Sequence, residues 1–195
     1  YICGKMNVTK YPASLKLNGQ DLPFVTTATH LGHELSQDCT MVQDTKIKRD
    51  AFIDRSINIR ETFDFANPEQ VLQAVVMYCC DHYGSMLWDL YSESSMKYFR
   101  CWNTCVKLAW DCPRSTHTYF VTNLLARGIV TVRTRVLSRY VKFVSSLLNS
   151  CSPEVVAVAN SSINDKGSIT GANLYKIQQE TGLNPSATTS QEVMN

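Results

Sequence analysis

Apolar residues recur at steps of three and four through most of the chain after position 44, and this period constrains the fold more than any other feature. Between positions 71 and 87 it is carried by Val71, Leu72, Val75, Val76, Cys79, Tyr83, Met86 and Leu87. Side chains three or four residues apart share one face of an α-helix, so this run predicts a buried helix, bent near Gly84. Similar runs predict helices over 96–110, 118–125 and 132–148, and a weaker one over 173–180.

Polar capping residues and prolines mark the expected helix ends. The predicted starts are Asn67-Pro68-Glu69, Ser94 or Ser95, and Ser152-Pro153-Glu154. Pro113 is expected to end the helix that follows Ser94, because proline has no amide hydrogen for the helical ladder.

The first 40 residues follow a different pattern of short extended runs and turns. Asn18-Gly19 predicts a tight turn, because both central positions of a type I′ turn need a positive φ. A further extended run, Ala28 to Leu35, is interrupted by Gly32. The expected fold class is therefore mainly α, with a small β-hairpin region at the N-terminus that is α+β in character.

The composition narrows the class of protein. The chain has 195 residues, of which 44% are hydrophobic and only 18% are charged. These values exclude a wholly disordered chain, a collagen-like fibre and a long coiled coil. The longest apolar run, Val71 to Cys80, is shorter than the roughly 18 residues of a membrane span.

The formal net charge of +2 hides two blocks of opposite sign. Residues 61–93 carry six acids and no Lys or Arg, whereas residues 97–148 carry nine Lys or Arg and one acid, Asp111. A phosphate-binding face would produce this asymmetry, and so would two segments that neutralise each other in the fold.

Five bases crowd the helix predicted from about Asp44: Lys46, Lys48, Arg49, Arg55 and Arg60. With 3.6 residues per turn, Lys48 and Arg55 share a face. Such residues on an exposed helix follow a phosphate backbone without reading its sequence. A solvated face with intrahelical ion pairs is the alternative, and charge alone favours it.

Cysteine and histidine residues raise the question of a metal site. Cys101, Cys105, Cys112 and His117 have the spacing C-x3-C-x6-C-x4-H, which offers the four donors that zinc needs. The first pair, however, lies in the middle of a predicted helix. We therefore favour buried core thiols and keep a zinc-binding module as the alternative.

No catalytic motif is present in the sequence. It contains no G-x-S-x-G, H-E-x-x-H, P-loop or G-x-G-x-x-G, and no aspartate pair with the local spacing of a metal-dependent polymerase. The sequence therefore shows no catalytic signature of its own, and we assign none of its residues to a metal site.

Four runs together carry a family resemblance. They are Ala28-Thr29-His30-Leu31-Gly32 after the Asn18-Gly19 turn, the run 78–88 (YCCDHYGSMLW), the run 101–108 (CWNTCVKL), and Pro113-Arg114. These runs resemble the part that follows the polymerase core in reverse transcriptases of non-LTR (LINE-type, Jockey-like) retrotransposons. The resemblance spans roughly residues 1–183, and the long Cys/Trp runs are its more specific part.

The resemblance implies a division of the chain and a set of binding residues. Residues 1–40 would be a palm-edge and primer-grip β-hairpin remnant, 41–66 a thumb-like helix, and 67–183 a helical C-terminal region. Residues 184–195 lie beyond the resemblance, and their polar composition predicts a disordered tail. Nucleic acid would be held by His30, Leu31 and Gly32 at the primer end, and by Lys46, Lys48, Arg49 and Arg55 along the phosphates. Weaker candidates for RNA contacts are Arg133, Arg135, Arg139 and Lys142.

The same resemblance implies that the catalytic part lies elsewhere. Such enzymes hold two Mg²⁺ ions with paired aspartates, which are expected upstream of Tyr1 together with the fingers and most of the palm. The absence of an initiator Met fits such a truncation. We therefore expect a fragment of an RNA-directed DNA polymerase that is inactive alone and needs no cofactor itself.

Within the full-length protein, the expected partners are an RNA template, a DNA primer and the missing palm and fingers domains. No association with a membrane is expected. The expected location of the full-length protein is the cytoplasm and the nucleus. The alternative hypothesis is a relic or domesticated helical interaction module with no polymerase or nucleic-acid function.

Overall fold

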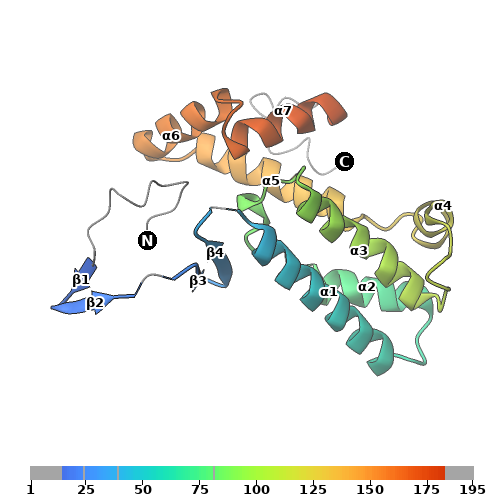
Figure 1. The fold of residues 1–195 in the computed structure, drawn as a ribbon. Helices are drawn as coiled ribbons and strands as arrows, with labels where there is room; N and C mark the ends of the chain where they lie inside the picture. The colour runs from blue at the N-terminus through green and yellow to red at the C-terminus, as the bar shows by residue number, and fades with distance from the viewer. Residues whose placement is uncertain (1–14, 24, 39, 81, 183–195) are drawn as a thin grey trace.

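The computed structural model describes residues 15–23, 25–38, 40–80 and 82–182. Two antiparallel hairpins come first, and helices make up the rest (Figure 1). The strands are β1 (Leu15–Leu17), β2 (Gln20–Leu22), β3 (Thr27–His30) and β4 (His33–Ser36). The α-helices are α1 (Val42–Thr62), α2 (Pro68–Cys79), α3 (Glu93–Ala109), α4 (Thr118–Phe120), α5 (Val132–Leu148), α6 (Pro153–Asn164) and α7 (Ile169–Thr181). This order confirms the predicted fold class, while the predictions for residues 1–14 and 184–195 lie outside the described residues.

Both hairpins turn on two residues with positive φ. Asn18 and Gly19 have φ values of 50° and 79°, as the sequence predicts. Leu31 and Gly32 have 48° and 75°, so the run predicted from Ala28 to Leu35 is two paired strands and not one. A leucine in this backbone region is uncommon, which is why the sequence did not indicate a second turn.

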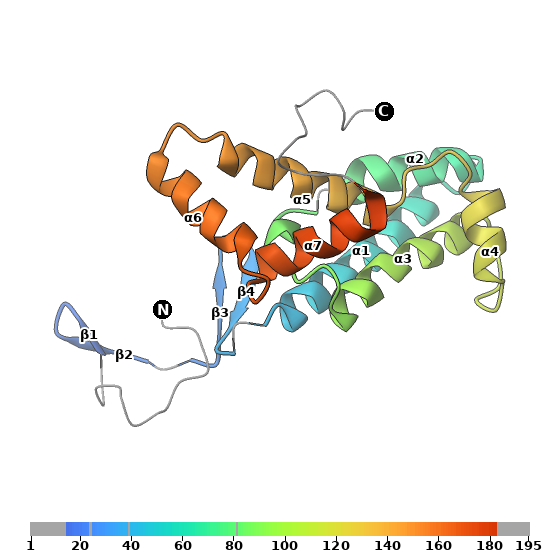
Figure 2. The same ribbon diagram turned by 90° about the horizontal axis from the view of Figure 1, so that it is seen from above.

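Helices α1, α2 and α3 form a three-helix bundle in which α1 and α3 run side by side in the same direction (Figures 1 and 2). At the middle of α1, the Phe52 ring lies 6.0 Å from the Tyr98 ring of α3. At its end, Arg60 forms an ion pair with Asp111 at 2.7 Å.

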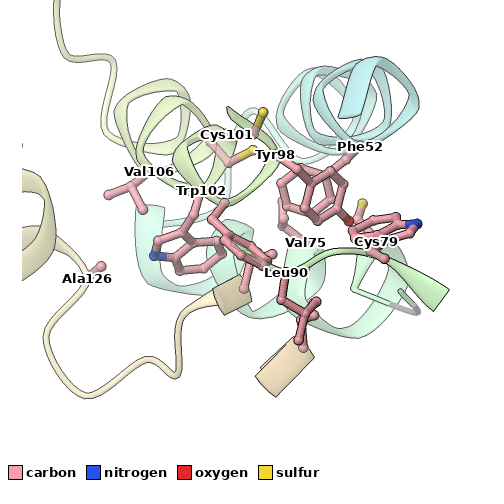
Figure 3. Packing of buried hydrophobic residues seen from close by; sticks show 14 of the residues in the cluster. Phe52, Val75, Cys79, Leu90, Tyr98, Cys101, Trp102, Val106 and Ala126 are labelled. Carbon is pink, nitrogen blue, oxygen red and sulfur yellow. The ribbon is translucent and has the colours of Figure 1, made fainter. Parts of the chain in front are cut away.

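The core of the bundle is aromatic and sulfur-rich. Figure 3 shows Phe52, Tyr98 and Trp102 pointing into the space between the helices, with Cys79 and Leu90 beside them. Each of these side chains is at most 5% exposed. The apolar period in the sequence therefore marks the residues that the fold buries.

Several helix ends differ from the predicted ones. The helix predicted over 71–87 does not bend near Gly84 but ends at Cys79, and a short 3₁₀ turn, η2 (Ser85–Leu87), follows. The positive φ values of His82 (48°) and Gly84 (73°) interrupt the helical hydrogen bonds between α2 and η2.

The cap of α3 is Ser92, whose hydroxyl accepts from the Ser95 amide, and α3 ends before Pro113 is reached. Over 118–125 the single predicted helix is α4 followed by a π-helical turn, η3 (Val121–Leu125). The helix over 132–148 and the Ser152 cap are confirmed, and the weak final helix is longer than predicted, beginning at Ile169.

Helix α7 is joined to the bundle through a buried amide. Asn173 is fully buried, its Oδ1 accepts from the Leu90 amide at 3.0 Å, and its Nδ2 donates to the Trp88 carbonyl at 2.9 Å. Both backbone groups belong to the loop between η2 and α3. The Asn173 side chain therefore supplies hydrogen-bond partners to a segment that has no regular backbone hydrogen bonds of its own. Helices α5, α6 and α7 lie together on one side of the bundle (Figure 1), where α5 also contacts η2 and α3.

Replacing Asn173 by alanine is expected to lower the free energy of unfolding by about 1–3 kcal/mol, because it leaves a buried donor and a buried acceptor without partners. Urea unfolding followed by circular dichroism measures the change. Asn160→Ala is the matched control, because Asn160 is exposed on α6, and its expected effect stays within about 0.5 kcal/mol. Equal effects of the two substitutions would contradict this role of Asn173.

Within the described residues, no helix combines the length and apolar character needed to cross a membrane.

Candidate nucleic-acid interface

The tip of the second hairpin is the most exposed apolar point near the start of the bundle. Leu31 is 71% exposed, and a Cβ added at Gly32 would meet no atom within 4 Å. Gly32 is therefore explained by its positive φ and not by crowding within the chain. The open space beside it leaves room for a close approach by another molecule.

One face of this hairpin is fixed to the bundle. His33 is buried at 5% exposure, and His30 lies opposite it in the register but remains exposed. On the other face, the Thr29 hydroxyl donates to the Glu34 carboxylate at 3.0 Å. The turn thus projects from a hairpin that is anchored through β4.

The anchor is a buried carboxylate at the start of α1. Asp44 Oδ2 accepts from Trp88 Nε1 at 2.9 Å and from Lys48 Nζ at 3.0 Å. Its Oδ1 accepts from the backbone amide of Glu34 at 3.2 Å, and His33 Nδ1 lies 3.4 Å from Oδ2. We call His33, Glu34, Asp44, Lys48 and Trp88 the Asp44 cluster. It joins the hairpin, the first helix and the loop before α3 at one point.

Hydrogen-bond geometry sets the role of His33 within the cluster. Lys48 Nζ lies 2.8 Å from His33 Nδ1, and an ammonium group can only donate. Nδ1 is then the acceptor in this contact. Because Nδ1 accepts from Lys48, its 3.4 Å approach to Asp44 is a close contact and not a second N–H···O bond.

The imidazole of His33 also lies directly against a glycine. A Cβ built at Gly84 would stand 1.6 Å from Cε1 and 1.9 Å from Nε2 of His33. The Tyr83 ring lies 5.2 Å from the imidazole, tilted by 30°. Gly84 is therefore required both by its φ of 73° and by the ring that covers it.

The cluster keeps Asp44 ionised. Burial alone would raise the pKa of this carboxyl group, but hydrogen bonds from Trp88, Lys48 and the Glu34 amide, together with the Lys48 charge, outweigh it and lower the pKa below its usual value. A buried carboxylate with three donors is a satisfied charge, and its removal leaves those donors unpaired.

The bases predicted to contact phosphates fall into three groups on α1. Lys46 and Arg55 are exposed, and neither forms an ion pair among the described residues. Arg49 donates to Asp50 at 2.7 Å from a half-buried position. Lys48 departs from the expectation, because its side chain is only 18% exposed and its ammonium is bound within the Asp44 cluster.

The cysteines of the possible zinc motif do not converge. Cys105 donates to the Ser56 hydroxyl at 3.1 Å, and Cys101 donates to the Lys97 carbonyl of its own helix. Burial raises the pKa of Cys101 to about 11 and that of Cys105 to about 12, so both stay as thiols.

His117 lies further along the chain and accepts from the Tyr119 amide as the cap of α4. No group of three His, Cys, Asp or Glu residues within the described ranges is arranged to hold a metal ion. The burial of Cys101 and Cys105, at 5% and 1% exposure, supports the hypothesis of core thiols.

Sequence reasoning missed Asp44, His33 and Trp88 as parts of a site. The only local signal was the i,i+4 spacing of Asp44 and Lys48, which is common on solvated helices. Trp88 lies 44 residues from Asp44, and no motif connects the two.

Comparison of the chain with family models, with curated proteins and with solved structures gives no match.

Proposed function

We propose that this chain is the primer-grip and thumb part of an RNA-directed DNA polymerase of the non-LTR retrotransposon type, and that it holds primer–template nucleic acid. The observation that carries the proposal is the exposed Leu31-Gly32 turn, fixed to the first helix of a three-helix bundle by the Asp44 cluster. A two-stranded hairpin is marginal alone, so anchoring of this kind supports a role in which the tip must keep its position.

The conformation of Leu31 supports a functional reason for this residue. Its φ of 48° is unfavourable for a leucine, and its side chain is 71% exposed, so it contributes no burial in return. Asn or Gly would fit this turn at lower cost. An apolar side chain held outward at such a cost is what a contact with a ribose or base at the primer end would require.

The positive charges of α1 support a contact of moderate strength with the phosphate backbone of the nucleic acid. Lys46 and Arg55 are available for phosphates, and Arg49 reaches them if it exchanges its partner Asp50 for a phosphate group. In the proposal Lys48 acts indirectly, by holding the hairpin through Asp44.

The proposal assigns no bond-making step to this chain. The paired aspartates that hold Mg²⁺ in such polymerases do not occur in the sequence, so purified protein is expected to extend no primer on an RNA template with magnesium. Cytoplasm and nucleus are the compartments that the proposal implies for the complete protein.

The proposal predicts a preference for a primer end. The purified chain is expected to bind a fluorescein-labelled RNA–DNA hybrid with a recessed DNA 3′ end several-fold more tightly than a blunt hybrid of the same length. Leu31→Asn should abolish this preference while leaving thermal stability equal or slightly higher, because Asn tolerates a positive φ. Lys46→Gln with Arg55→Gln should weaken both complexes and lower the salt slope by about 2.

Leu17→Asn is the control, because Leu17 is likewise an exposed leucine at the tip of a hairpin, although it is the last residue of β1 and not part of the turn itself. It should keep the full preference for the recessed end. Equal loss in both leucine variants would contradict the role of Leu31, and no binding of either hybrid at low salt would favour the relic or interaction module.

A further inference from the structure

One end of the three-helix bundle carries exposed aromatic side chains on two connecting segments. Phe65, between α1 and α2, is 83% exposed, and its ring lies 6.3 Å from the Phe63 ring. On the segment between α3 and α5, Tyr119 and Phe120 of α4 are exposed with their rings 6.5 Å apart, and Leu124 of η3 is exposed as well. Packing in the core of the bundle therefore does not account for these apolar side chains.

Both segments lie at the same end of the bundle. Residues 63–67 connect α1 to α2, and residues 110–117 connect α3 to α4. The ion pair between Arg60 and Asp111, at 2.7 Å, joins the end of α1 to the end of α3. Figure 1 shows the connection between α1 and α2 on the same side of the molecule as α4. The β3–β4 hairpin is bound to the opposite end of α1.

Charges of opposite sign accompany the aromatic residues on the two segments. The segment around the α1–α2 connection carries Glu61, Asp64 and Glu69, and the segment between α3 and α5 carries Arg114 and Arg127. All five are exposed, and none of them forms an ion pair with a residue that the structure describes. Positions 112–153 contain no Asp or Glu. We call these five residues, together with Phe65, Tyr119, Phe120 and Leu124, the bundle-end surface.

A second copy of the chain matches this surface better than a partner of one charge. Aromatic side chains are enriched at protein–protein interfaces and supply much of the binding energy there. In a twofold dimer both copies use the same surface, so the acidic segment of one copy faces the cationic segment of the other. A uniformly basic or uniformly acidic partner would instead meet like charge on one of the two segments.

We propose that the bundle-end surface binds a second copy of this chain in a twofold arrangement. Phe65 and the aromatic pair of α4 are buried between the copies, and the acidic and cationic segments pair across the axis at two equivalent contacts. The proposal goes beyond the proposed function, because no nucleic acid takes part and the surface lies at the other end of α1 from the Leu31 turn. Either can fail without the other.

The test reverses the charge of each segment in the full chain and follows self-association by sedimentation velocity after nuclease treatment. The wild type is expected to pass from monomer to dimer as its concentration rises through the micromolar range. Glu61→Lys with Asp64→Lys puts like charges at both contacts, and so does Arg114→Glu with Arg127→Glu. Each double variant alone is expected to dimerise at least about tenfold more weakly.

An equimolar mixture of the two double variants gives the most specific result. One variant then carries only acidic and the other only cationic segments, so both contacts again join opposite charges. A mixed dimer is expected with an affinity within about threefold of the wild type. Charge effects remote from the surface would not restore association in the mixture.

Lys46→Glu with Arg100→Glu is the matched control for the Arg114 and Arg127 variant. Both residues are exposed cations in the first half of their helices, and self-association should stay within about threefold of the wild type. Phe65→Ala should weaken the dimer at least about tenfold without shifting the urea midpoint of unfolding. A monomeric wild type, double variants that dimerise as the wild type does, or a mixture that stays monomeric would each overturn the proposal.

Discussion

Alanine at position 44 is expected to lower the free energy of unfolding by about 3–5 kcal/mol, as for the removal of one partner from a buried charge pair. The substitution leaves the Trp88 indole, the Glu34 amide and the Lys48 ammonium without their acceptor. Urea unfolding measures the loss. Asp54→Ala is the matched control on the same helix, because Asp54 is exposed, and it should stay within about 0.5 kcal/mol.

Asp44→Asn gives a second measurement if the alanine variant does not fold. Because the folded-state pKa of Asp44 lies below the unfolded value of about 3.9, its ionisation adds stability above that value. This contribution is lost as pH falls through the lower, folded-state pKa. The stability difference between the wild type and Asp44→Asn should be constant from about pH 5 to 7 and shrink below about pH 4. A difference that stays constant into strong acid would contradict an ionised Asp44.

Gly84→Ala has the second largest expected effect, a loss of about 2–4 kcal/mol. One part is the cost of a Cβ at φ 73°, about 1–2 kcal/mol, and the other is the clash with the His33 ring. Gly128→Ala isolates the first part, because Gly128 has a φ of 79° but no atom within 4 Å of a built Cβ. In thermal unfolding, the Gly84→Ala variant should therefore have a clearly lower unfolding temperature than the Gly128→Ala variant.

A double-mutant cycle with His33→Ala separates the clash from the backbone cost. Removing the imidazole makes room for the new methyl group, so Gly84→Ala should cost at least about 1 kcal/mol less in the His33→Ala background. Additive losses in the two single variants would contradict the close contact of His33 with Gly84.

The apolar period was sufficient to predict the helices but not the contacts between distant segments. Positions 132–148 form the predicted helix, in which the buried residues Val132, Val136, Tyr140 and Val144 recur at four-residue steps. At Gly84, by contrast, the sequence predicts only a bend, because nothing near it indicates that an imidazole from residue 33 lies against its α-carbon.

Lys48 and Leu31 mark the limits of the same reasoning at the candidate site. The helical repeat places Lys48 and Arg55 on one face, yet Lys48 turns to the buried Asp44 while Arg55 stays exposed. Whether a helix-surface lysine meets solvent depends on the segment packed beside it, here β4 and Trp88. The Leu31 turn was not predicted as a turn because residue preferences disfavour leucine at positive φ.

The Asp44 cluster has a consequence for when and how long the Leu31 turn exists. Its contacts close a chain interval of 44 residues between Asp44 and Trp88, so they form only after the helices have come together. We therefore expect the β3–β4 hairpin to open together with the helices and its tip to last about as long as the bundle. The first hairpin has exposed residues throughout β2 and is free to fray on a far shorter timescale. We therefore expect two hairpins of nearly equal length to differ in their dynamics, because the second is joined to the bundle by the Asp44 cluster and by the packing of His33 against Gly84.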